Sequence, residues 1–181
     1  MRVTTEDTMA LIVDFQERLV PVIDQQEELI HNTEILIKGL QILDIPMVVT
    51  QQYTKGIGMT VPALKDLFEK EFYYEDKVTF SCAQDENILQ KIKATGRKNI
   101  LVCGIEAHIC VLQTIIDLLS MGYQVYLVED CVGSRKEENR QIGIKRAIQE
   151  GAFSTSYESI LFELTGVAKT DRFKEISRLI K

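Results

Sequence analysis

The sequence contains no tryptophan, three prolines and two histidines among its 181 residues. It also has no apolar stretch near the roughly 18 residues that a bilayer-spanning helix needs. The first residues, MRVTTEDTMALIVDF, place acidic residues before the apolar run and include no small-residue cleavage site. We therefore expect no membrane segment and no signal peptide.

Positive charge is also scarce. The 21 lysines and arginines are outnumbered by 27 aspartates and glutamates, which gives a formal net charge of −6, and no basic run is interleaved with aromatic residues. This composition argues against a nucleic-acid partner. The four cysteines (Cys82, Cys103, Cys110 and Cys131) have no C-x-x-C spacing. Without a secretion signal, neither a disulfide framework nor a zinc site is expected, and we predict a reduced, cytoplasmic protein.

Short β-branched runs alternate with longer amphipathic stretches along the whole chain. Strands are predicted at 9–15, 45–52, 72–80 (weaker), 98–105, 123–130 and 152–156. Helices are predicted at 26–44, 60–70, 81–96, 107–121 and 136–150, with two more within 157–181. This alternation predicts an α/β fold, a three-layer doubly wound domain (1–181) with a parallel sheet of about six strands flanked by helices.

Glycine is missing where a nucleotide-binding protein of this fold would need it. The first strand is followed by DFQERLVP, which contains no glycine, so a dinucleotide-binding loop is not expected, and no P-loop is present. The segment QQYTKGIG after the second strand has no histidine, aspartate or glutamate, which makes a metal site improbable. We expect neither a cofactor nor a metal.

Candidate reactive residues come from the rule that sites in open parallel sheets lie at the carboxyl ends of the strands. Asp14, Lys77 and Cys110 all fall there. Each has an ordinary alternative: Asp14 as a helix cap, Lys77 as a surface lysine paired with Glu75 or Asp76, and Cys110 as an inert buried thiol. Together they could form a carboxylate, lysine and thiol cluster in which the lysine stabilises a thiolate.

The position of Cys110 carries the most information. GIEAHIC passes from a strand through a tight turn into a helix, where free N–H groups and the helix dipole favour negative charge. We expect this position to lower the pKa of the thiol, and the adjacent amides to hold an oxyanion. His108 points away from Cys110 if the helix is regular, so we expect it to have a structural or rim role, and His31 a place on a helix surface.

LIVDFQ, DKVTFS and GIEAHICVLQT, in this order and spacing, resemble the isochorismatase-like cysteine hydrolase superfamily. The resemblance extends to VEDCVGSR after the fifth strand and covers nearly the whole chain. TQQYTKGIG is similar to the isochorismatase domain-containing subgroup.

The resemblance implies that Asp14, Lys77 and Cys110 form a catalytic triad. It also implies a cis peptide between Ile105 and Glu106, and an oxyanion hole made of the backbone N–H groups of Glu106 and Cys110. Homo-oligomers, dimers or larger, are expected.

For the substrate, Phe15, Gln51, Tyr53 and Ile105 suggest a small, mostly apolar pocket. Metal-binding nicotinamidases of this superfamily carry an aspartate and several histidines, for which the stretch here has only amides, a tyrosine and a threonine. Lys55 is the only cation in TQQYTKGIG, whereas the anionic substrate of a true isochorismatase would require cationic groups.

Three functions stay open. The first is a metal-independent hydrolase that cleaves a C–N bond of a small amide or carbamoyl compound through a thioester on Cys110. The second is vinyl-ether hydrolysis, in which Asp14 is the acid and the thiol is dispensable. The third is a non-catalytic scaffold protein that retains the pocket.

Overall fold

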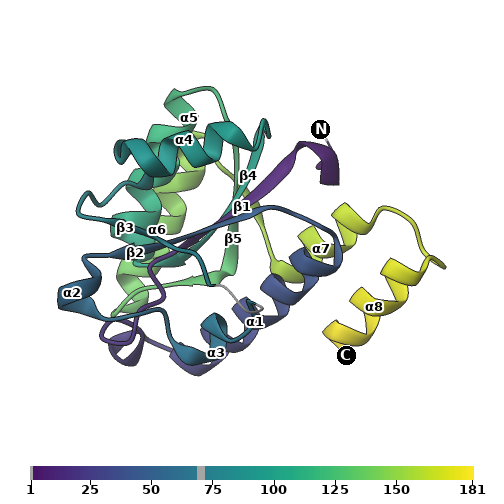
Figure 1. Cartoon of the computed structure of the whole chain (residues 1–181), viewed down its shortest axis with the longest axis horizontal. Helices are drawn as coiled ribbons and strands as arrows, with labels where there is room; N and C mark the ends of the chain where they lie inside the picture. The colour runs from purple at the N-terminus through teal and green to yellow at the C-terminus, as the bar shows by residue number, and fades with distance from the viewer. Residues whose placement is uncertain (1, 69–71) are drawn as a thin grey trace.

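The computed structural model describes residues 2–68 and 72–181 as a sheet with helices on both faces (Figure 1). The strands are β1 (Thr8–Val13), β2 (Met47–Gln52), β3 (Glu75–Lys77), β4 (Asn99–Ile105), β5 (Gln124–Gly133) and β6 (Phe153–Thr155). The α-helices are α1 (Gln26–Ile42), α2 (Thr54–Ile57), α3 (Pro62–Lys65), α4 (Glu86–Ala94), α5 (Leu112–Ser120), α6 (Glu137–Glu150), α7 (Tyr157–Thr165) and α8 (Asp171–Ile180). Short 3-10 turns lie at η1 (Thr5–Asp7), η2 (Val20–Val22) and η3 (Cys82–Gln84), and η4 (Ala107–Val111) is a π-helical turn.

All six strands are parallel, in the order β3-β2-β1-β4-β5-β6. The predicted doubly wound α/β fold is therefore confirmed. The strand order reverses between β1 and β4, so these neighbouring strands are followed by helices on opposite faces and a crevice opens beyond their carboxyl ends. Asp14 follows β1 and the Cys110 segment follows β4, which brings both to this switch point.

Side chains of β1 alternate between two hydrophobic cores. Ala10 and Ile12 pack in the core under α1, α3, α7 and α8, while Met9, Leu11 and Val13 pack in the core under α4, α5 and α6. Figure 1 shows α1, α7 and α8 on one side of the sheet and α4, α5 and α6 on the other. Because both faces of β1 are covered, the strand reads as a continuous apolar run in the sequence.

Close approach of β1 and β4 depends on Gly104. Its φ is +139°, and a Cβ built there would lie 2.2 Å from the carbonyl oxygen of Val13. Val13 and Gly104 are register partners in the β1–β4 pair. Val13 directly precedes Asp14, and Gly104 directly precedes Ile105, the last residue of β4. A glycine is thus required where the two strands that carry the site come together.

Several predicted boundaries were wrong, and the strand expected at 72–80 is limited to β3 (Glu75–Lys77). The helix expected at 60–70 is reduced to α3, with residues 69 and 70 outside the described residues. The helix expected at 81–96 begins only at Glu86, because the Asp85 side chain accepts the N–H groups of Asn87 and Ile88 and caps it there. The fifth strand does not stop at Asp130 but continues to Gly133.

In the described residues, no helix combines the length and the apolar character required to cross a membrane.

Candidate functional site

Asp14 lies directly after β1 with no exposed surface. Its backbone adopts a left-handed conformation (φ +56°), which aspartate tolerates better than most residues. One carboxylate oxygen, Oδ1, accepts the hydroxyl of Thr50 at 2.8 Å, and the other, Oδ2, accepts Lys77 Nζ at 2.7 Å. The carboxylate therefore has partners from β2 and β3, and it does not act as a helix cap.

Lys77 ends β3 and is 1% exposed. Besides Asp14, its ammonium group donates to Gln52 Oε1 at 2.7 Å and to the carbonyl oxygens of Thr79 and Phe80 at 3.2 and 3.1 Å. Burial alone would lower the pKa of Lys77, but the attraction of Asp14 and of the nearby thiols outweighs it and raises the pKa. Lys77 is thus held as a buried cation.

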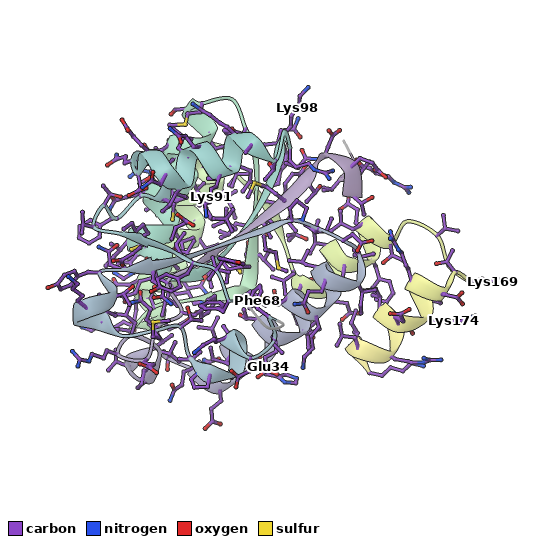
Figure 2. All side chains as sticks on the ribbon, in the orientation of Figure 1. Glu34, Phe68, Lys91, Lys98, Lys169 and Lys174 are labelled. Atoms are coloured by element: carbon purple, nitrogen blue, oxygen red, sulfur yellow. The ribbon has the colours of Figure 1, made fainter. Side chains whose placement is uncertain are left out.

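The alternative of a surface lysine does not hold. Glu75 pairs with Lys91, and Asp76 accepts the backbone N–H and the hydroxyl of Thr54. Figure 2 shows Lys98, Lys169 and Lys174 pointing outwards from the ribbon. Lys77 differs from these lysines because its charge is buried and fully surrounded by acceptors.

Cys110 lies in η4, the turn that follows β4, and is 7% exposed. The Asp14 carboxylate and the Lys77 ammonium both act on its thiol. Burial and the negative charge of Asp14 raise the pKa of Cys110 to about 12, although Lys77 acts to lower it. The expected lowered pKa was therefore wrong: desolvation and a neighbouring carboxylate outweigh the favourable helix start. At neutral pH the site holds a thiol next to a base rather than a preformed thiolate.

The backbone around this thiol is tightly organised. The peptide bond between Ile105 and Glu106 is cis. The Glu106 carbonyl oxygen accepts the N–H groups of Ile109 and Val111 at 3.0 and 3.3 Å. We refer to residues 106–111 as the Cys110 turn.

A second thiol, that of Cys82, also lies at the site. Cys82 Sγ lies 3.7 Å from the Thr50 hydroxyl, and the charges of Asp14 and Lys77 both act on its pKa, which burial raises to about 11. The Cys82 backbone N–H donates to Thr114 on α5, the helix that follows Cys110. Cys82 and Thr50 were missed because each is ordinary in sequence; the signal for Cys82 was its place five residues after Lys77.

The four residues expected to line a substrate pocket differ in exposure. Phe15, Gln51 and Ile105 are buried, and the Gln51 amide is occupied by the hydroxyls of Thr54 and Thr60. Tyr53 is 52% exposed. Of the four, Tyr53 is therefore the residue with a side chain open to a ligand in this conformation.

Glu106, at the start of the Cys110 turn, does not leave its side chain free. Instead its carboxylate, largely buried, accepts the backbone N–H and the Nε of Arg135. His108 Nδ1 lies 2.9 Å from Ser134 Oγ, which agrees with the structural or rim role expected for it. Ser134 and Arg135 follow the true end of β5 and were missed because the strand was ended too early.

In residues 2–68 and 72–181, no cluster of three or more histidine, cysteine, aspartate or glutamate side chains could hold a metal ion. The groups at the site are a carboxylate, an ammonium, a buried thiol and backbone amides. Such a set can move a proton between sulfur and oxygen and can carry an acyl group on sulfur.

This is a doubly wound α/β protein whose polar cluster lies at the topological switch point. Residues 8–159 match the family model described as the isochorismatase domain. The chain is 37% identical to the secreted isochorismatase effector Isc1 of Phytophthora sojae, over 99% of this chain and 87% of that one. It is 35% identical to isochorismatase domain-containing protein 2 of Danio rerio, over 99% of this chain and 89% of that one. The chain belongs to the isochorismatase family of hydrolases.

Solved structures agree with this placement. A MAR1 ribonuclease from Caenorhabditis elegans is 36% identical and superimposes with a TM-score of 0.92, covering 99% of this chain and 92% of that chain. YcaC from Escherichia coli, described as an octameric hydrolase of unknown specificity, has a TM-score of 0.89 at 22% identity, covering 99% of this chain and 95% of that one. At this lower identity the likeness concerns the fold.

Proposed function

We propose that this protein is a metal-independent cysteine hydrolase that cleaves the C–N bond of a small amide or carbamoyl compound. The observation that carries the proposal is the position of Asp14, which accepts the Lys77 ammonium at 2.7 Å and whose charge acts on the Cys110 thiol. A base in contact with a nucleophile, and itself oriented by a third group, is the arrangement that nucleophilic catalysis requires.

In the first half of the reaction, Asp14 takes the proton of the Cys110 thiol as the sulfur attacks the substrate carbonyl carbon. The raised pKa of Cys110 makes this transfer part of the attack, because little thiolate exists beforehand. The backbone N–H groups of Glu106 and Cys110 hold the oxyanion of the tetrahedral intermediate. The C–N bond then breaks, and Asp14 returns its proton to the leaving amine or ammonia.

In the second half, Asp14 removes a proton from water as its oxygen attacks the thioester carbon. The C–S bond breaks, the acid product leaves, and the proton on Asp14 returns to the sulfur. Lys77 stays charged throughout and keeps the Asp14 carboxylate oriented between transfers. Because its ammonium is surrounded by acceptors from β2 and the segment after β3, Lys77 positions the base rather than donating a proton.

We propose a small-molecule substrate that enters beside Tyr53, with Phe15, Gln51 and Ile105 behind the pocket wall. The net charge of −6 and the 7% exposure of Cys110 favour a small neutral or weakly polar compound over RNA. We further propose that residues 1–181 act as one domain in the cytoplasm and assemble into homo-oligomers. The octameric state of the E. coli YcaC protein supports the last point.

The test is a screen of small amides and carbamoyl compounds for release of ammonia or amine, run beside the Cys110→Ala variant. We expect turnover by the native protein and none by the variant, with an acyl mass increment on the Cys110 peptide after acid quenching. Vinyl-ether hydrolysis that survives in Cys110→Ala would overturn the thioester route in favour of acid catalysis by Asp14. An RNA substrate, included because of the ribonuclease name of the C. elegans relative, is a further arm of the screen.

A further inference from the structure

The carboxylate of Glu106 is an unusual group to find beside an oxyanion hole. Glu106 begins the Cys110 turn and its side chain is 9% exposed. A negative charge at this place opposes the charge that develops on the substrate oxygen and on sulfur, because few water molecules screen it there. The fold must therefore compensate this charge locally.

The compensation comes from the segment after β5. Arg135 donates its backbone N–H to Glu106 Oε2 at 3.0 Å and its Nε to both carboxylate oxygens at 3.1 Å. In the part of the chain that the structure describes, these are the hydrogen bonds of the Glu106 carboxylate. One residue thus supplies a main-chain donor and a positive charge to the same group.

The same segment also holds the rest of the turn. Ser134 Oγ lies 2.9 Å from His108 Nδ1, and the Ser134 carbonyl oxygen accepts the backbone N–H of Asp24 at 3.0 Å. Helix α6 packs directly on the turn at Gly143, where a Cβ would lie 2.8 Å from backbone atoms of Ala107 and His108. The position of Arg135 is therefore fixed relative to Cys110 although its side chain is 59% exposed.

We propose that Arg135 is a positioning residue of the Cys110 turn: by neutralising the Glu106 carboxylate it keeps the turn able to stabilise negative charge on the Cys110 sulfur and on the substrate oxygen. This inference rests on the proposed cysteine hydrolase function. Because the Arg135 side chain is largely exposed, the ion pair itself adds little to folding stability. Its effect is on the reactivity of Cys110.

The test measures the rate of Cys110 alkylation by acrylamide at pH 7, assigned to individual cysteines by peptide mass spectrometry, and needs no known substrate. In Arg135→Ala, the uncompensated Glu106 charge should slow Cys110 labelling by about tenfold, the effect of a one-unit rise in the pKa of the thiol. Arg146→Ala is the matched control: it removes an exposed arginine from α6, paired with Glu150, and should leave the rate unchanged.

A double-mutant cycle separates the effect of the Glu106 charge from other effects of losing Arg135. It compares the native protein, Arg135→Ala, Glu106→Gln and the double variant Arg135→Ala/Glu106→Gln. In the Glu106→Gln background, the loss of Arg135 should slow labelling by less than about twofold, since no charge is left to compensate. A structural role for Arg135 would leave the double variant as slow as Arg135→Ala. Arg135→Lys, which retains the charge, should keep most of the native rate and also serves if Arg135→Ala does not fold.

The outcomes separate this inference from the proposed function. Suppose that native Cys110 labels faster than free cysteine. If Cys110 in Arg135→Ala then labels as fast as in the native protein, or if the double variant labels as slowly as Arg135→Ala, the inference is overturned and the hydrolase proposal stands. If native Cys110 labels no faster than free cysteine, the proposed function fails and the inference falls with it.

Discussion

Asp14 and Asp130 belong to the same sheet and each lies near a cysteine, but their carboxylates have different partners. Asp14 follows β1 with a thiol and a buried lysine against its carboxylate. Asp130 lies in β5 next to Cys131, but its Oδ1 accepts the backbone N–H of Tyr157 at the start of α7. Burial raises the pKa of Asp130. An acid beside a cysteine in this sheet can therefore serve to hold a helix start instead.

The cations make the difference. The Lys77 ammonium donates to Asp14, and the side chain is buried. Arg140, the cation near Asp130, instead donates to the carbonyl oxygens of Val132 and Glu129 and to Glu137. The Asp14 region thus combines a carboxylate, a thiol and a buried cation, whereas the Asp130 region joins β5 to α6 and α7.

The largest contrast is expected between Asp14→Asn and Asp130→Asn. Asp14→Asn leaves the Lys77 ammonium buried without a counter-charge, which should lower the free energy of unfolding by about 3–5 kcal/mol. Asp130→Asn retains an acceptor for Tyr157 and should cost about 1 kcal/mol or less. Urea unfolding at pH 7 measures both, and equal midpoints would show that the Asp14–Lys77 pair is not a distinct region of the fold.

Gly104→Ala tests the close approach of β1 and β4. A methyl group 2.2 Å from the Val13 carbonyl oxygen must push the strands apart, at a cost of about 3 kcal/mol. Gly122→Ala is the control, because Gly122 also has a positive φ (+86°) but nothing lies within 4 Å of its Cβ position. That variant should lose only about 1–2 kcal/mol from the backbone conformation. Similar losses in thermal or urea unfolding would refute the packing argument.

Thr50→Val removes the hydroxyl that donates to Asp14. A hydrogen bond to a charged group contributes about 1.5–3 kcal/mol, so this loss should exceed that of Thr33→Val, which removes a bond to the Leu29 carbonyl oxygen near Cys131. Thr50→Val should also lower the rate of Cys110 labelling, whereas Thr33→Val should not. Labelling rates that fall equally in both variants would count against a special role of the Asp14 network.

The pH dependence of stability is the smallest effect for any single residue. The pKa of Cys82 is raised to about 11 and that of Cys110 to about 12, above the usual 9.0. Because the folded-state values are the higher ones, the stabilisation is complete below about pH 9 and is lost as the pH rises through them. By pH 10 each thiol should cost about 1 kcal/mol.

The measurement is urea unfolding at pH 7, 9 and 10. Cys103→Ala is the comparison in the Asp130 region, because burial also raises the pKa of Cys103 and its removal should reduce the slope above pH 9. A free energy of unfolding that stays constant from pH 8 to 10 would contradict the assignment of buried neutral thiols.

Much of the fold was predictable because parallel strands buried on both faces, such as β1, appear as short apolar runs between amphipathic helices. The ends of the elements were less predictable. Helix α4, capped by Asp85, begins five residues after its predicted start, and the acids Glu129 and Asp130 concealed the continuation of β5. The strand-end rule also brought Asp14, Lys77 and Cys110 together. It could not reveal Thr50, Cys82 or Arg135, because their roles depend on contacts between elements distant in sequence.

The predicted direction of the Cys110 pKa shift was wrong. A helix start and a nearby lysine suggested a lowered pKa, but burial and the adjacent Asp14 carboxylate raise it. Which of these opposing influences is larger depends on depth of burial, which sequence does not give. With the raised pKa, proton transfer from the Cys110 thiol to Asp14 becomes part of the proposed attack.

The most direct test of that mechanism is acrylamide labelling of each cysteine at pH 7 in the native protein and in Asp14→Asn. Base assistance predicts that native Cys110 reacts at least about tenfold faster than free cysteine, that the buried Cys103 and Cys131 do not react, and that Asp14→Asn removes the advantage of Cys110. Labelling of Cys110 no faster than free cysteine, or unchanged in a folded Asp14→Asn protein, would contradict it.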